Sequence, residues 1–217
     1  IGLMPKLNYL YMYINKITSL PVTLGWSTTI RNIRMYQNQI TTAGLPVNVC
    51  NNTKLRELHF YLNSISSFPD EYANCSQLQY FHFTSNLFTE LPLWIFDLSL
   101  RELSFADNSI TSIPNEISNL KHTLRKLWVN SNALGSIPEG IGELYELQLF
   151  YAYSCSLSVL PDVFGNLTKM TDFRVYSNQL TQLPDSITNM TKLTYFYAYY
   201  NQLTSLPEDV GKWENVK

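Results

Sequence analysis

Charge is scarce in this chain. Lys, Arg, Asp and Glu make up 15% of its 217 residues, against about 25% in an average soluble domain. The 15 basic and 17 acidic residues leave a formal net charge of −2. A nucleic-acid-binding protein needs a basic face to neutralise phosphates. The charge balance therefore argues against nucleic acid as a partner.

Long apolar runs and catalytic motifs are also lacking. The longest run, Leu91 to Phe96, is interrupted by Pro92 and is far shorter than the roughly 18 residues of a membrane span. The chain contains no G-x-S-x-G, H-E-x-x-H, Walker loop or G-x-G-x-x-G, the signatures of common hydrolase, metalloprotease and nucleotide sites. We expect no transmembrane segment in this chain, no cofactor and no enzymatic activity.

A repeat organises what is there. A segment of the form L-x-x-L-x-L-x-x-N recurs nine times at spacings of 22 to 25 residues, each time followed by Pro. The first apolar positions are Leu7, Ile30, Leu55, Leu78, Leu100, Leu124, Leu147, Met170 and Leu193. The final positions are Asn15, Asn38, Asn63, Asn86, Asn108, Asn132, Cys155, Asn178 and Asn201. Such self-similarity is the signature of a solenoid.

Over essentially the whole chain this pattern resembles the leucine-rich-repeat family. The resemblance implies an α/β-type solenoid, a horseshoe with a concave parallel β-sheet and a convex side of short 3₁₀ or helical turns. We expect residues 1–217 to form a single array of about nine repeats. Neither end carries a polar cap of the kind an array needs over its end repeats. We therefore expect both terminal caps to be absent and the chain to be a fragment of a longer protein.

The residue types at the repeat positions favour that fold independently of the resemblance. In each segment the first, fourth and sixth positions are apolar, as in a strand with one buried side. The recurring Asn can bond backbone groups where the chain leaves the strand, and Cys155 replaces one Asn as a structural residue. After each Pro, apolar residues three positions apart, such as Ile117 and Leu120, favour a short 3₁₀ turn.

Tyrosine gathers at the outward strand positions. Of the 15 tyrosines, 13 lie two, four, six or seven residues after a first apolar position, on the expected concave face. Tyr combines a large apolar ring with a polar tip and few rotors, and it dominates paratopes. We interpret the concave face as a binding surface for a protein, or for a carbohydrate. Self-association and purely structural Tyr ladders are the competing interpretations.

These aromatics form two clusters. The C-terminal aromatic cluster holds the only concave Trp and is the preferred site. Its candidate binding residues are Trp128, Tyr151, Tyr153, Arg174, Tyr176, Tyr195, Tyr197, Tyr199 and Tyr200, with Asp172 beside them. The N-terminal aromatic cluster supplies the candidates Tyr13, Tyr36, His59, Tyr61 and His82, with Tyr9, Tyr11, Arg34 and Tyr80 beside them. The small or polar residues Ser104, Ala106 and Asp107 separate the clusters.

Two smaller features carry weaker hypotheses. His59 and His82 are neighbours in one strand row, but open strands rarely converge enough ligands for a metal. We expect ordinary or pH-sensitive polar contacts and no metal site.

Cys50 and Cys75 occupy non-equivalent points of successive return limbs. We expect two thiols there, with a disulfide as the alternative.

Four N-x-S/T sequons share one register, four residues before the next first apolar position. They begin at Asn51, Asn74, Asn166 and Asn189. That register predicts a convex location, where glycans would leave the concave face free. The alternative is that the sequons are inherited repeat consensus.

Two function classes follow. The first is an extracellular or cell-surface recognition or adhesion module. The aromatic face resembles that of variable lymphocyte receptors, and N-Q-L-T-S-L-P at 201–207 is similar to their modules. The second is an intracellular signalling scaffold, because the L-P-x-x-I-x-x-L form is similar to Ras-pathway leucine-rich scaffolds and Roco proteins.

Overall fold

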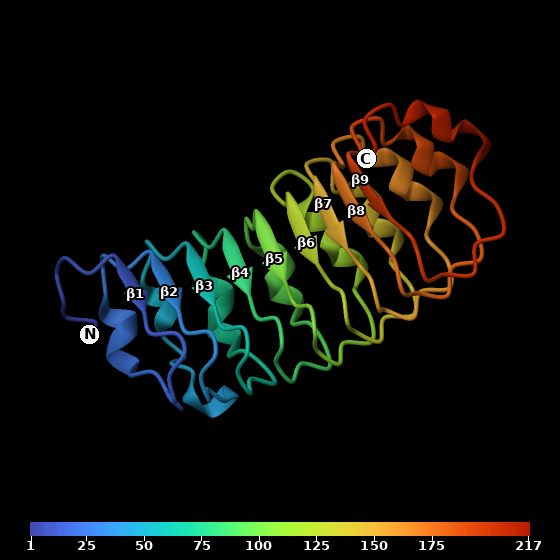
Figure 1. Ribbon diagram of the computed structural model, residues 1–217. Coiled ribbons are helices and arrows are strands. Elements are labelled where there is room, and N and C mark those ends of the chain that lie inside the picture. The colour runs from blue at the N-terminus through green and yellow to red at the C-terminus, as the bar shows by residue number, and fades with distance from the viewer. The chain divides into compact units, whose positions relative to one another are not determined.

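Each repeat folds into one short strand followed by a 3₁₀ segment. The computed structural model describes residues 1–217, in two compact units, Ile1–Asn108 and Ser109–Lys217. The first unit contains β1 (Tyr9–Tyr11), β2 (Asn32–Arg34), β3 (Glu57–His59), β4 (Tyr80–His82) and β5 (Glu102–Ser104). The second contains β6 (Lys126–Trp128), β7 (Leu149–Tyr151), β8 (Asp172–Arg174) and β9 (Tyr195–Tyr197). Figure 1 shows the strands of each unit side by side.

The strands pair in parallel and in the register that the repeat predicts. Glu57 faces Tyr80 and His59 faces His82 across β3 and β4, and Tyr151 faces Arg174 across β7 and β8. The middle residue of every strand from β1 to β8 is buried, while most of the flanking residues are at least partly exposed. The predicted outward rows are therefore confirmed.

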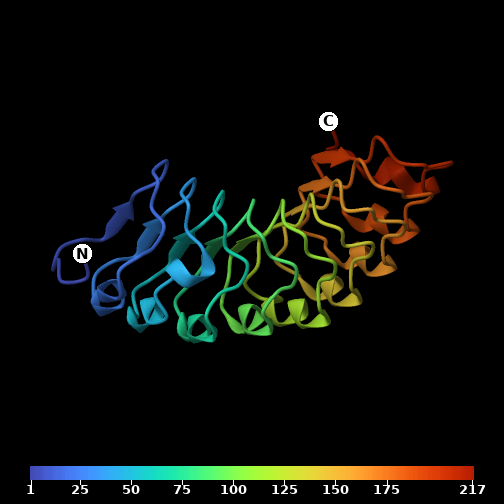
Figure 2. The same ribbon diagram turned by 90° about the horizontal axis from the view of Figure 1, so that it is seen from below.

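Except for η2, the 3₁₀ helices form the other side of each unit (Figure 2). η2 precedes Pro46, and its Thr42 bonds Ser66 and Ser67. Eight of the 3₁₀ helices begin directly after the repeat's Pro, whose fixed φ and missing N–H suit a helix start. Those in the first unit are η1 (Val22–Trp26), η2 (Thr42–Gly44), η3 (Val49–Asn51), η4 (Asp70–Asn74) and η5 (Leu93–Asp97). Those in the second are η6 (Asn115–Leu120), η7 (Glu139–Glu143), η8 (Asp162–Asn166), η9 (Asp185–Asn189) and η10 (Glu208–Lys212). The predicted 3₁₀ limb is confirmed, and none of the helices is long and apolar enough to cross a bilayer.

The core between strands and 3₁₀ helices is rich in Phe. In the first unit, Phe68 lies within 4.8–5.2 Å, between ring centroids, of Phe81, Phe83 and Phe88. In the second unit, the ring of Phe164 packs between those of Phe150 and Phe173 at 5.5 and 5.2 Å. These large rings bury much apolar area per repeat.

The predicted asparagine ladder is present. The amide of Asn86 donates to the carbonyls of Phe60, Phe83 and Thr84 and accepts from the N–H of Ile65. Asn38, Asn63, Asn108, Asn178 and Asn201 repeat this pattern. Each amide thus bonds backbone groups of two successive repeats at the point where the chain leaves the strand.

Cys155 takes the asparagine position in β7's repeat. It is a free thiol with no exposed surface, and its Sγ donates to the carbonyl of Val129 at 3.4 Å. Burial raises the pKa of this thiol to about 11. A thiol that stays protonated and buried is unreactive, which agrees with the structural role expected for Cys155.

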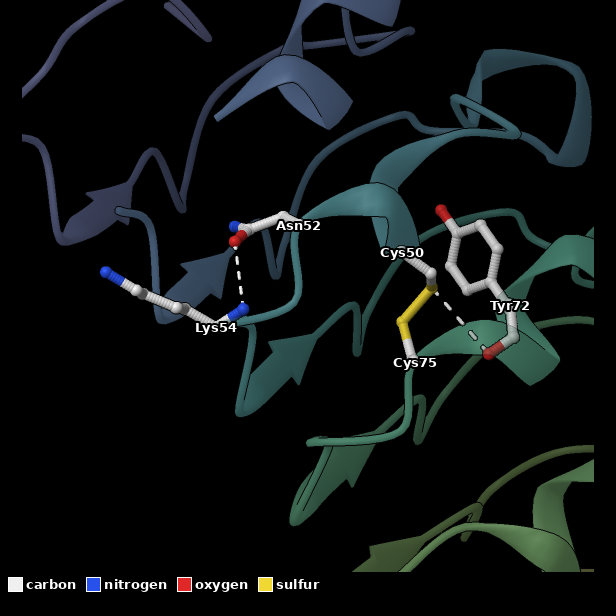
Figure 3. The surroundings of a disulfide bond; sticks show 5 residues. All are labelled: Cys50, Asn52, Lys54, Tyr72 and Cys75. Atoms are coloured by element: carbon white, nitrogen blue, oxygen red, sulfur yellow. Dashed lines mark hydrogen bonds between the residues drawn. A yellow bond between two sulfur atoms is a disulfide. The ribbon is translucent and has the colours of Figure 1, made fainter. Parts of the chain in front are cut away.

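The expectation of two thiols at Cys50 and Cys75 is wrong. The two residues form a disulfide, with Cα atoms 4.6 Å apart (Figure 3), within the range that disulfides require. Cys50 lies inside η3 and Cys75 directly after η4. η3 begins three residues after Pro46, whereas η4 begins directly after Pro69. Cys50 is four residues after its Pro and Cys75 is six residues after its own, so the bonded positions are not equivalent in the repeat.

Candidate partner-binding face

Within each unit, the candidate binding residues lie on one face, which we call the strand face: the outward side chains of the strands and the turn residues that follow each strand. The two aromatic clusters belong to different units, the N-terminal one to Ile1–Asn108 and the C-terminal one to Ser109–Lys217. Each cluster is built from two parts, a charged group near the strand centres and a tyrosine stack in the turns.

Arg174 is the centre of the C-terminal cluster. Its Nε and Nη2 each donate to a carboxylate oxygen of Asp172 at 2.8 Å. Its guanidinium lies over the rings of Tyr151 and Tyr197, at 4.2 and 5.0 Å from their centroids. The hydrogen bonds to Asp172 raise the pKa of Arg174. A bidentate pair between two rings fixes the guanidinium plane, so this group is held in one orientation before any partner arrives.

Tyr151 joins this group to the only Trp on the strand face. Its hydroxyl donates to Asp172 at 2.7 Å, and its ring meets Trp128 edge-on at 6.2 Å. Burial, followed by the hydrogen bond to Asp172, raises the pKa of Tyr151. The structure therefore brings Trp128, Tyr151, Arg174 and Tyr197 together, as a connected aromatic and charged surface.

A tyrosine stack lies beside this surface. Tyr153, Tyr176 and Tyr199 stand one above another, with centroids 4.4 and 4.5 Å apart and planes within 8° and 10° of parallel. Burial raises the pKa of Tyr176, and Tyr153 adds to the effect. Tyr200, 79% exposed, meets Tyr199 edge-on. The remaining candidate, Tyr195, is exposed at the start of β9.

The N-terminal cluster repeats this design. Tyr13, Tyr36 and Tyr61 stack at 4.4 and 4.2 Å with planes 6° and 8° from parallel. Burial, together with the hydrogen bond between the hydroxyl groups of Tyr61 and Tyr36, raises the pKa of Tyr61 to about 12. In-register parallel strands lie about 4.8 Å apart, which is close to the stacking distance of aromatic rings. The repeat itself therefore aligns the two stacks.

Stacking decides what these tyrosines present to a partner. The middle ring of each stack is covered on both faces by its two neighbours. Only its edge and its hydroxyl group are left for a partner. A sugar that packs on aromatic rings needs a free ring face, whereas peptide groups and polar side chains can hydrogen-bond to a row of hydroxyls. The middle rings of the two stacks, Tyr36 and Tyr176, therefore offer no free face to a sugar.

The charged part of the N-terminal cluster contains both histidine candidates. Arg34 donates to Glu57 at 3.1 Å and lies over Tyr11, 4.8 Å from the ring centroid. His59 Nε2 is 3.5 Å from the same carboxylate, and the His82 ring meets that of His59 edge-on at 4.6 Å. Burial, and then the charge of Arg34, lowers the pKa of His59. Both imidazoles thus lie near carboxylates, His59 at Glu57 and His82 at Glu102, and the pH sensitivity of these contacts stays a prediction.

Two further contact candidates were not apparent from the sequence. The residue seven after each first apolar position has a positive φ in all nine repeats. Six repeats place Ser, Asp or Gln there, but Ile14 and Leu62 are 60% and 47% exposed at φ 57°. A bulky residue rarely adopts this conformation. Each of them directly follows an end ring of the Tyr13–Tyr61 stack in the sequence. The sequence signal that could have revealed them is an apolar residue at a repeat position that is polar in most repeats.

Comparison with known proteins agrees with this architecture. Residues 98–141 match the family described as "Leucine Rich repeats (2 copies)". A leucine-rich-repeat protein from Leptospira interrogans has a TM-score of 0.88 at 23% identity, covering 97% of this chain and 54% of its own. The chain therefore has the fold of leucine-rich-repeat proteins.

Other leucine-rich-repeat structures are similar to it. The functional domain of InlJ from Listeria monocytogenes, which includes a cysteine ladder, has a TM-score of 0.83 at 24% identity, with 100% of this chain and 44% of its own covered. The plant peptide hormone receptor RGFR1, in complex with RGF2, has a TM-score of 0.79 at 27% identity, with 100% and 40% covered. No curated protein sequence matches the chain. The chain spans about half the length of these structures or less.

Proposed function

We propose that this chain is a non-enzymatic recognition module that binds a protein partner through its strand face. The observation that carries the proposal is the pre-ordered C-terminal cluster, in which the Arg174 group lies beside a stack of three tyrosines. Tyr, Trp and Arg dominate binding hot spots. Groups already fixed in one orientation lose little freedom on association.

The proposed setting is extracellular or at a cell surface. The Cys50–Cys75 disulfide supports it, because such bonds persist in oxidising compartments and are rare in the cytosol. A plant peptide hormone receptor among the similar structures supports it as well. The disulfide weighs against the alternative of an intracellular signalling scaffold. If the partner is fixed to a surface, the same binding results in adhesion.

The test replaces Tyr153, Tyr176 and Tyr199 by Ser and measures binding to a panel of purified extracellular domains. We expect a partner of the unchanged chain to lose at least about tenfold in affinity, or 1.4 kcal/mol. Replacing the same three residues by Phe keeps the stack and removes only the hydroxyls, so it separates the two contributions. Tyr145→Ser is the matched control, because Tyr145 is a 47% exposed tyrosine outside the strand face.

Each stacked pair contributes about 0.5–1.5 kcal/mol beyond its buried area, so the Ser variant should remain folded at a moderately lower Tm. If it unfolds while the Phe variant does not, the stack is structural and the proposal loses its main support. Unchanged affinity in the Ser variant would also contradict it. Sedimentation velocity of the chain alone, compared with the Ser variant, shows whether the partner is a second copy.

A further inference from the structure

We propose that the 3₁₀ side of each unit carries N-linked glycans, at Asn51 and Asn74 in the first unit and at Asn166 and Asn189 in the second. The proposal rests on the extracellular setting proposed above, and is independent of what the strand face binds. Its evidence is the way in which the fold presents all four sequons.

All four sequons share one pattern of burial. The Asn side chain is exposed, the middle residue is buried, and the hydroxyl residue is exposed again. The buried middle residues, which anchor each sequon in the core, are Asn52, Cys75, Leu167 and Met190. The exposed hydroxyl residues are Thr53, Ser76, Thr168 and Thr191. A bulky glycan therefore meets no core side chain, and both recognised groups lie at the surface of one turn.

The local backbone is also the same at three of the sites. The N–H of the hydroxyl residue donates to the carbonyl of the sequon Asn at 2.8 Å for Asn74 and at 2.9 Å for Asn166 and Asn189. The asparagines of the ladder, by contrast, bond several backbone groups and lie next to the strands. The chain thus holds two populations of asparagine, one tied into the fold and one presented to solvent.

The fold does not itself require Asn at these positions. Glu143, Leu144 and Tyr145 occupy the same turn in β7's repeat, with the same exposed, buried, exposed pattern and a 2.8 Å bond from the Tyr145 N–H to the Glu143 carbonyl. Glu143 and Tyr145 therefore form this turn as well as the Asn and the Ser or Thr of a sequon do. Because the turn accepts other residues, the sequons are not needed for folding, and this argues against a purely structural origin.

The modification is a glycosyl transfer. The side-chain Nδ2 of Asn attacks the anomeric carbon of an oligosaccharide carried on a polyisoprenyl pyrophosphate. The new bond joins nitrogen to carbon, the bond from carbon to the phosphate oxygen breaks, and its electron pair leaves with the pyrophosphate. The amide nitrogen loses one proton. The donor belongs to the secretory pathway, where the Cys50–Cys75 disulfide would also form.

Glycans in these turns would restrict where partners can dock. They are large, solubilising and confined to the surface, and here they would cover the side of each unit formed by the 3₁₀ helices. The strand face would stay open. The proposal therefore gives a physical reason for the location of the aromatic clusters on the opposite side.

The test is peptide mapping of the protein isolated from its own source, after enzymatic deglycosylation in heavy-oxygen water, which converts each glycosylated Asn to labelled Asp. We expect label at two or more of the four sites. Label at none or at one overturns the proposal. The same map reports Cys50 and Cys75. A linked pair with unlabelled sites contradicts the glycans alone, whereas free thiols with unlabelled sites contradict the extracellular setting too.

A gain-of-site variant checks the geometric argument. Glu143→Asn together with Tyr145→Thr writes a sequon into the matched turn, and the full chain is secreted from a eukaryotic host. We expect label at position 143, at an occupancy comparable to Asn166. Glu143→Asn alone is the control and should stay unlabelled. If the double variant is secreted, folded and unlabelled at 143 while Asn166 is labelled, the shared turn does not direct modification.

Discussion

His59 lies where burial disfavours its charged form. Its side chain is 14% exposed, and it faces Arg34, Glu57, Tyr61 and His82. Burial and the Arg34 charge lower the pKa of the imidazole, and Glu57 opposes them only in part. The folded protein therefore binds fewer protons at this residue than the unfolded chain does, once the pH falls to about 6.5.

Acid should consequently destabilise the fold through His59. The free energy of unfolding falls as the pH drops below about 6.5, and it stops falling below the pKa of His59 in the folded protein. The total loss is about 1.4 kcal/mol for each unit by which folding lowers that pKa. Urea unfolding at about pH 7.5 and about pH 5.5 measures this slope. His59→Gln should flatten it, while the exposed His122→Gln should leave it as in the unchanged chain. Equal slopes in all three proteins would rule out His59 as the cause.

The sequence predicts which residues reach the strand face, but not how they combine there. A strand period of two fixes that Tyr151, Arg174 and Tyr197 point outward. It does not specify that Arg174 turns back along its own strand to Asp172 and lies between rings from two neighbouring strands. The conformation of the Arg174 side chain depends on its rotamers and on which nearby acceptors compete for it. The sequence pattern of a single repeat carries neither kind of information.

At the scale of the element, the turn after each strand is the most uniform part of the repeat. All nine turns place a non-Gly residue at positive φ. For Ile14 the conformation is costly, because the branched Cβ crowds the following carbonyl, at about 1–2 kcal/mol. No burial offsets this cost, since the side chain is 60% exposed. Strain without a packing benefit is typical of a site kept for contact.

Relieving the strain should stabilise the protein. Ile14→Asn puts a residue that tolerates positive φ in the turn, and we expect the free energy of unfolding to rise by about 1 kcal/mol. Val47→Asn is the matched control, since Val47 is 50% exposed and is not among the positive-φ residues. It should give no gain. Urea unfolding of both variants decides: equal effects would mean that exposure, and not backbone strain, sets the cost at Ile14.

At the scale of the whole molecule, periodicity explains both the success and the failure of prediction. In a solenoid each repeat contacts mainly its neighbours, so one correct register places every strand, every 3₁₀ limb and the asparagine ladder. The same reasoning fails where a repeat departs from the period. Cys50 lies in the 25-residue repeat, where the 3₁₀ helix η3 begins three residues after Pro46 instead of directly after the Pro. The disulfide was therefore the feature least accessible to sequence analysis.

That disulfide should make the two units respond differently to reductant. It closes 25 residues of sequence within Ile1–Asn108, and a loop of that length is worth about 3 kcal/mol by its restriction of the unfolded chain. Amide hydrogen exchange with and without dithiothreitol should therefore show lost protection around η3, β3, η4 and β4. Residues 109–217 should change little, because stability in a repeat array passes mainly between neighbours. Cys50→Ala with Cys75→Ala should already show the reduced pattern and be insensitive to reductant. An equal loss of protection throughout the chain would mean that the array unfolds as one cooperative block.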